Sequence, residues 1–232
     1  MPYAFYAFIS IMIFSLVHLC AERVRGFEEQ TGGRFLSFAG GVAIAYVFVD
    51  LLPKLSKSDQ IVREALQGVF PQVEKHVYIM ALIGFLFYFA VDRGQFLLKE
   101  RGSYWLSILS YALFNFLIGY AVVDKDDPEV RPLALFTFAI ALHYFTIDYS
   151  LGKQASYGTK EKWALVVCLF LGWCAGLGKA IPPTAIALVS AFIGGGMIMN
   201  VTRHELPKQS SNSLNAFILS ALFYTAVLLF LG

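Results

Sequence analysis

Five polar side chains lie within long apolar stretches of this chain, where a polar group needs a reason to be present. They are His18, Asp50, Asn115, His143 and Asp148. An ionisable group that is left without a partner in hydrocarbon costs about 2.5–3.5 kcal/mol or more, so residues of this kind mark ion or solute pathways and binding sites. These five side chains are therefore the first candidates for function, and the elements that carry them must position them.

The composition indicates that those elements cross a membrane. Hydrophobic residues make up 58% of the 232 residues and charged residues 15%, whereas a soluble protein is about half apolar and about a quarter charged. The mean hydropathy is +0.64. A hydrocarbon core of about 30 Å is crossed by about 20 helical residues. We therefore predict an all-α polytopic membrane protein, with 1–232 forming a single transmembrane domain of eight helices, at about 3–21, 34–53, 76–98, 103–123, 132–152, 162–178, 181–203 and 212–232.

The distribution of charge predicts how these helices are oriented. No Lys or Arg precedes the first apolar stretch, which is therefore a retained helix and not a signal peptide. With the N-terminus outside, the cytoplasmic loops hold eleven Lys and Arg and the outer loops seven, so we expect both termini outside the plasma membrane. The segment 56–73 is predicted to form an interfacial amphipathic turn. The apolar side of that turn would consist of Ile61, Val62, Ala65, Leu66 and Val69.

One internal similarity predicts an inverted repeat. The segment 40–54, which ends the second predicted helix, is identical to the segment 194–208, which ends the seventh, at seven of fifteen positions. The second and seventh helices run in opposite directions in an eight-helix scheme, and inverted repeats of this kind are common in secondary transporters. Chance similarity between two glycine-rich apolar helices is the alternative. We interpret the glycines of both segments as sites of close helix packing.

Four polar residues lie close to predicted helix ends, and two of them, His204 and Glu205, are not among the five named above. We interpret His204 and Glu205 as residues of the cytoplasmic rim that water reaches, and Asp50 as a further candidate for the solute pathway or its rim. His18 precedes Glu22 by four residues, and we interpret it as a satisfied rim histidine and not as a ligand.

Two further motifs resemble those of the ZIP zinc/iron permease family. The segment 111–119 (YALFNFLIG) looks like that family's fourth-helix motif, Ala-Leu-His-Asn-Phe-x-Asp-Gly, and 139–148 (AIALHYFTID) is similar to its fifth-helix motif, Ala-Leu-His-Glu-x-Pro-His-Glu. The helix endings at 48–53 and 204–207 also resemble the family's leucine–proline endings. The resemblance covers nearly the whole chain and implies eight helices in a 3+2+3 arrangement, with outside termini and transport of a divalent cation.

The resemblance also implies a metal site, which this chain keeps only in part. Asn115, His143 and Asp148 retain ligand-type residues, whereas the remaining family positions are replaced, as Phe114, Ile118, Tyr144 and Ile147. A borderline cation needs about four N or O ligands. His143 and Asp148 are five residues apart, so they lie about 140° apart around an ideal helix and share one site only if that helix is distorted.

Two hypotheses follow for function. The first is a ZIP-like transporter of divalent cations of the zinc, iron or manganese class. The second keeps the fold and makes the chain a carrier of a non-metal solute, or a non-transporting membrane subunit or sensor, because the replaced positions create an apolar centre. Enzyme activity is not expected, since no HExxH motif occurs. A net charge of +2 without a long basic block predicts no nucleic-acid partner. No cofactor is expected beyond a transported cation, and the partners are membrane lipid and that cation, with a homodimer left open.

Overall fold

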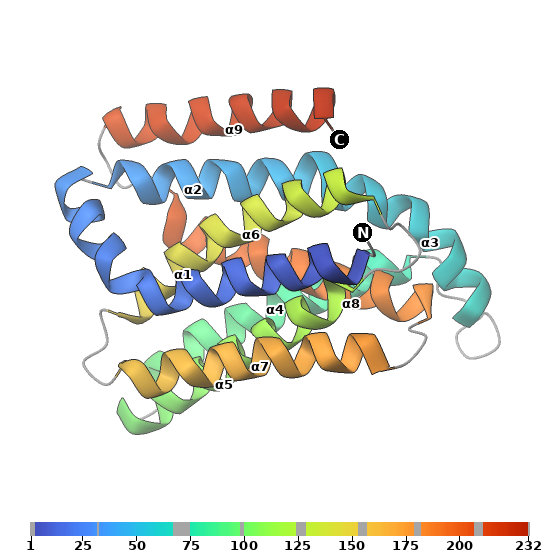
Figure 1. Cartoon of the computed structure of the whole chain (residues 1–232), viewed down its shortest axis with the longest axis horizontal. Coiled ribbons are helices and arrows are strands. Elements are labelled where there is room, and N and C mark those ends of the chain that lie inside the picture. Colours follow the sequence, from blue (N-terminus) through green and yellow to red (C-terminus); the bar gives the residue numbers. More distant parts are fainter. Residues whose placement is uncertain are drawn as a thin grey trace.

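The computed structural model describes eight stretches of the chain, and within them it describes only the backbone for a few residues. The stretches are 3–31, 33–66, 75–97, 100–123, 129–152, 157–178, 182–206 and 211–231. They fold into a bundle of helices that run side by side along one direction (Figure 1). The elements are α1 (Tyr3–Thr31), α2 (Arg34–Ala45), η1 (Tyr46–Leu51), α3 (Leu52–Leu66), α4 (His76–Leu97), α5 (Glu100–Ala121), α6 (Val130–Leu151), α7 (Thr159–Gly178), α8 (Pro183–Asn200), η2 (Val201–Glu205) and α9 (Ser211–Leu231).

The described part of the chain contains eight helical runs that are long and apolar enough to cross a membrane. This confirms the predicted number of helices. The first predicted span, 3–21, matches the apolar run Tyr3–Cys20, although the helix α1 itself continues to Thr31. The prediction stopped where charged residues begin, but Glu and Arg are themselves good helix formers, so a helix outlasts its apolar segment.

The second predicted helix also continues beyond its expected end at Pro53. The elements α2, η1 and α3 form one run, Arg34–Leu66, of 33 residues. Proline has no N–H to donate, and the turn before it is a π-helix, in which the N–H of Leu52 bonds to the carbonyl of Val47. At 1.5 Å per residue the run is about 50 Å long, which exceeds the thickness of a bilayer core.

The described part of the predicted amphipathic turn, 56–66, is helical and belongs to α3. Leu55, Asp59 and Val62 are buried, at the spacing that places them on one side of a helix. Ile61 is 49% exposed and Ala65 is exposed as well, so these two do not belong to the buried face. Val69 lies outside the described residues.

The helix pairs repeat across the bundle. Extensive packing joins α2 to α9 and α4 to α8, and it joins α1 to α6 and α5 to α7. The α2–α9 pair corresponds to the α8–α4 pair, and the α1–α6 pair corresponds to the α7–α5 pair. In this correspondence α1 takes the place of α7, α2 of α8, α4 of α9 and α5 of α6. In Figure 1, α2 and α8 run in opposite directions. Each of these packing pairs therefore has a counterpart among the others.

The same correspondence holds at single residues of the two similar segments. A Cβ atom on Gly41 would lie 2.0 Å from Ser220 Oγ of α9, and one on Gly195 would lie 1.8 Å from the carbonyl oxygen of Ala81 in α4. These glycines allow the close approach of two helix pairs that are counterparts. The N–H of Leu206 bonds to the carbonyl of Val201 at 3.1 Å, which reproduces the π-type bond of η1 in η2.

Candidate functional site

Two buried histidine–carboxylate pairs lie against α6. One, which we call the His18 cluster, contains His18, Asn115, Asp148 and Tyr157 from α1, α5, α6 and the segment before α7. The other, the Glu205 cluster, contains His143, Thr146 and Glu205 from α6 and η2. Each cluster joins elements that are far apart in the sequence.

Every polar side-chain atom of His18, Asn115 and Asp148 has a hydrogen-bond partner. His18 Nδ1 lies 2.7 Å from Asp148 Oδ2, and His18 Nε2 lies 2.8 Å from Asn115 Oδ1. Asn115 Nδ2 donates to the carbonyl of Tyr111 at 2.9 Å, which directs the amide oxygen toward the imidazole. The side chains of His18 and Asp148 are both 0% exposed.

These contacts define where protons belong in the His18 cluster. The amide oxygen of Asn115 can only accept, so His18 Nε2 carries a proton that it donates. Nδ1 faces a carboxylate, which accepts when it is ionised. The pair is therefore an imidazolium beside a carboxylate, or its neutral counterpart with the second proton on Asp148, and it carries no net charge in either form.

Tyr157 completes this cluster from the segment before α7. Its hydroxyl donates to Asp148 Oδ1. Burial, followed by the neighbouring Asp148 carboxylate, raises the pKa of the Tyr157 phenol above its usual range. The phenol thus stays protonated at neutral pH and remains a donor, which leaves both oxygens of Asp148 partnered.

The Glu205 cluster is satisfied on one side only. His143 Nδ1 lies 2.8 Å from Glu205 Oε1, and the Thr146 hydroxyl donates to the same oxygen at 2.6 Å. His143 Nε2 and Glu205 Oε2 are buried and have no hydrogen-bond partner among the described residues. Such open atoms in a buried pair are costly unless a ligand, a water or a proton uses them.

Aromatic rings occupy the space between the two clusters. The ring centroids of Tyr144 and His18 are 4.5 Å apart, and those of Phe114 and His143 are 5.7 Å apart. Phe114 and Tyr144 themselves meet edge to face at 6.1 Å. Ile118 and Ile147 are buried as well. The side chains of Phe114, Ile118, Tyr144 and Ile147 therefore contribute to the core of the bundle.

The structure separates the three residues predicted to share a metal site. Asn115 and Asp148 come together through His18, whereas His143 faces Glu205. The helical geometry anticipated this, because α6 remains an α-helix from Val130 to Leu151 and keeps His143 and Asp148 on different faces. Among the described residues, no group of three or more His, Cys, Asp or Glu is placed to hold a metal ion.

Two rim interpretations were wrong, and both errors concealed a partner. His18 is 0% exposed and Glu205 is 3% exposed, so neither lies where water reaches it freely. Asp50 lies 3.1 Å from Lys54, by Oδ2 and Nζ, a contact that is an ion pair by distance without the alignment of a hydrogen bond. The side chain of His204 lies outside those that the structure describes.

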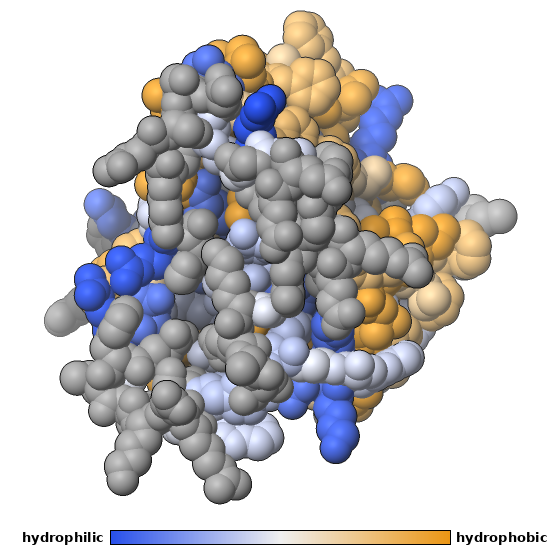
Figure 2. All heavy atoms as spheres, turned by 90° about the vertical axis from the view of Figure 1, so that its left-hand side faces the viewer, coloured by the Kyte–Doolittle hydropathy of each residue, from blue (hydrophilic) through white to orange (hydrophobic). Residues whose placement is uncertain are grey.

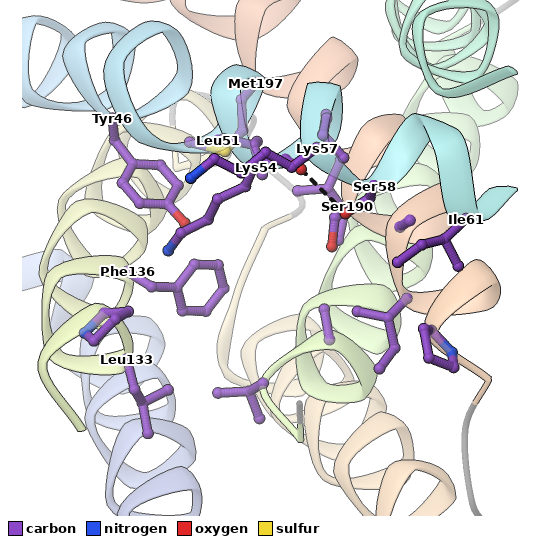
Figure 3. Close-up of a pocket in the computed structure, with 18 of the residues that line it drawn as sticks. Tyr46, Leu51, Lys54, Lys57, Ser58, Ile61, Leu133, Phe136, Ser190 and Met197 are labelled. Carbon is purple, nitrogen blue, oxygen red and sulfur yellow. Dashed lines mark hydrogen bonds between the residues drawn. The ribbon is translucent and has the colours of Figure 1, made fainter. Parts of the chain in front are cut away.

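We call the end of the bundle where α1 begins the Tyr3 end, and the opposite end, where η2 lies, the Glu205 end (Figure 1). A cavity lies at the Tyr3 end, where η1 meets α3. The cavity has a volume of about 420 Å³. Its lining includes Tyr46, Leu51, Lys54, Phe136 and Met197 (Figure 3). Sequence reasoning did not find it, because its residues are mostly apolar and come from five distant segments.

No model of a known protein family matches this chain, and none of the curated proteins with which it was compared matches it.

Proposed function

We propose that this chain is an integral membrane transporter with the ZIP-like 3+2+3 arrangement of inverted repeats. In it, the group of α1, α5, α6 and α7 would move against the group of α2, α4, α8 and α9. The observation that carries the proposal is the residue-level correspondence of the repeats. Gly40 packs against Glu205, and its counterpart Gly194 packs against Leu51, which is the counterpart of Glu205. Inverted repeats that surround a central site are the common architecture of secondary transporters.

The surface supports placement in a bilayer. Large apolar side chains are exposed along α9, including Leu219 at 65%, Leu229 at 71% and Phe230 at 86%. In Figure 2, which views the Glu205 end, coloured hydrophilic side chains gather at the left and below, and hydrophobic ones gather at the top and on the right. An apolar flank between polar ends suits a bilayer. The excess of Lys and Arg in alternate loops favours the plasma membrane orientation with the Tyr3 end and both termini outside.

The two ends of the bundle differ. The Tyr3 end has the cavity, whereas the two buried histidine–carboxylate pairs lie toward the Glu205 end. We assign the cavity to the state of the transporter that faces outward. Rocking of one group of helices against the other would close the cavity and open a path at the Glu205 end.

The geometry favours a solute other than a bare divalent cation. The carboxylates of Asp148 and Glu205 already pair with histidines, and a cation would have to displace them. Lys54 and Lys57 line the cavity, and their positive charge opposes the entry of a cation.

Divalent-cation transport is the second candidate, and one observation favours it. His143 Nε2 and Glu205 Oε2 are open atoms of the two ligand types, imidazole and carboxylate, that zinc accepts. In that case the pair would rotate toward the ion, which belongs to the zinc, iron or manganese class.

Flux and accessibility measurements test the proposal together. In a variant without Cys20, Cys168 and Cys174, Ser190→Cys in the cavity should react with an impermeant thiol reagent from outside only. Asn200→Cys, near the Glu205 end, should react slowly from inside only. Asn200→Cys that never reacts from either side would contradict alternating access.

The cargo is tested in proteoliposomes that contain a metal-sensitive dye. We expect zinc, manganese and ferrous uptake no faster than in protein-free liposomes. Uptake above that level that is lost in His143→Ala, but kept in His76→Ala, would replace the first candidate by divalent-cation transport. His76 is the matched control, because it is a buried histidine outside both clusters.

A further inference from the structure

We propose that the cavity beside Lys54 binds a small amphipathic anion, a carboxylate with an apolar or aromatic body. This inference rests on the proposed function, since the bound anion would be the cargo. The volume of about 420 Å³ lies within the range of sites that enclose small organic molecules. It is also much larger than a single dehydrated metal ion requires.

The charge of the cavity selects the sign of its ligand. Lys54 and Lys57 are the charged side chains among the described lining residues. In Figure 3 the Lys54 side chain reaches into the cavity from α3 and ends close to the hydroxyl of Tyr46. Asp50 lies 3.1 Å from the ammonium without the alignment of a hydrogen bond, so this contact uses none of the three N–H donors of Lys54. A carboxylate bound in the cavity would accept from these donors.

The rest of the wall selects an apolar body. The Phe136 ring lies 5.9 Å from the Tyr46 ring, directly below Lys54 in Figure 3. Leu51, Leu133 and Met197 add aliphatic surface around it. An anionic head beside Lys54 would therefore place its hydrocarbon or aromatic body over Phe136. An inorganic ion would leave this apolar surface unused.

The inverted repeat shows why this chemistry belongs to the Tyr3 end. Leu51 lines the cavity, whereas its counterpart Glu205 carries a carboxylate at the opposite end. An anion finds a lysine and an aliphatic wall at one end, and a buried acid at the other. The two repeats thus differ in charge where they correspond in backbone.

Equilibrium binding to the full chain in phosphatidylcholine nanodiscs tests the inference. The probes are 3-phenylpropionate, its neutral amide 3-phenylpropionamide and the cation 3-phenylpropylamine, measured by calorimetry. We expect saturable binding of the acid, and binding at least about tenfold weaker for the amide, as the loss of a charged hydrogen bond implies. Lys54→Gln should weaken the binding of the acid by about the same factor, and Lys54→Arg should retain that binding. Arg63→Gln, exposed on the same helix outside the cavity, is the matched control and should change nothing.

Two outcomes would overturn the inference. Equal binding of acid and amide would remove the role of the charge, and unchanged binding in Lys54→Gln would remove the site. Lys54 is 42% exposed, so this variant is expected to fold, and its thermal unfolding is measured in parallel.

A second arm separates a soluble anion from a lipid headgroup with the same chemistry. With phosphatidylglycerol in the nanodiscs, unchanged binding of the acid supports a soluble ligand. Displacement of the acid, together with phosphatidylglycerol that copurifies with the wild type but not with Lys54→Gln, supports a headgroup. Binding without flux in liposomes would contradict the transporter and leave the anion site in place, so the two proposals fail separately.

Discussion

The two histidine–carboxylate pairs on α6 share their chemistry and differ in completeness. In the His18 cluster both ring nitrogens and both carboxylate oxygens have partners. In the Glu205 cluster one nitrogen and one oxygen are open. A fully satisfied buried network rigidifies its surroundings, whereas a partly satisfied one keeps capacity for a ligand or a proton.

This difference separates structure from function in the centre of the bundle. The His18 cluster joins α1, α5 and α6 and the segment before α7 through charge-assisted hydrogen bonds, so it holds one half of the bundle together. The Glu205 cluster joins α6 only to η2, at the helix end that corresponds to the wall of the cavity. A transporter in which the group of α1, α5, α6 and α7 moves against the group of α2, α4, α8 and α9 must break contacts of the second kind and keep those of the first.

The largest expected effect breaks the first pair. In Asp148→Leu, the imidazole of His18 and the hydroxyl of Tyr157 both lose their buried acceptor, so we expect a loss of about 3–5 kcal/mol in unfolding free energy. Glu205→Met removes one oxygen that accepts from His143 and Thr146 and one that has no partner, and we expect a smaller loss of about 1–3 kcal/mol. Reversible unfolding of the purified variants measures both.

Leu at 148 and Met at 205 have nearly the length of the acids that they replace and no hydrogen-bonding oxygen, so the two substitutions are matched in chemistry and differ in their environment. Equal losses would contradict the distinction between a complete and an incomplete pair. A larger loss for Glu205→Met would reverse it.

The next effect concerns the glycines that correspond in the two repeats. A Cβ atom on Gly40 would lie 2.7 Å from Glu205 Cβ, which the backbone fixes, whereas one on Gly194 would lie 2.8 Å from the flexible end of Leu51. We expect Gly40→Ala to cost about 1–3 kcal/mol and Gly194→Ala less than about 1 kcal/mol. Gly178→Ala is the control, because nothing lies within 4 Å of its Cβ position. Thermal unfolding should rank the three in that order, and a loss at Gly194 as large as at Gly40 would contradict it.

The sequence predicted the elements well because apolar length decides them. The number of long apolar helices was confirmed, and the similarity between 40–54 and 194–208 corresponds to the same π-type bond in both segments. The helix ends were less well predicted, since charged residues extend α1 and a π-helical turn carries the chain through Pro53. Composition does not report either effect.

The partners of the candidate residues could not be predicted, because they depend on how helices rotate and pack. His18 and Asp148 are 130 positions apart, and no local spacing connects them. One signal was available: a histidine inside an apolar stretch requires a partner at depth, which the nearby Glu22 obscured. For Glu205, the adjacent charges suggested a water-exposed rim, whereas the continuation of α8 through η2 places its carboxylate against α6.

The smallest expected effect sharpens the comparison by removing a single donor from the complete pair. Tyr157→Phe deletes the hydroxyl that donates to Asp148 Oδ1 and leaves the pair of His18 and Asp148 intact. Because Tyr157 is half-buried, water can replace its hydroxyl, and we expect a loss of about 1 kcal/mol, at the low end for a hydrogen bond to a charged group. Thr146→Val, which removes the hydroxyl donor from Glu205, is the matched change in the other cluster. If Tyr157→Phe proved as destabilising as Asp148→Leu, the phenol and not the imidazole would be the group that holds Asp148, and the His18 cluster would depend on the segment before α7 more than on α1.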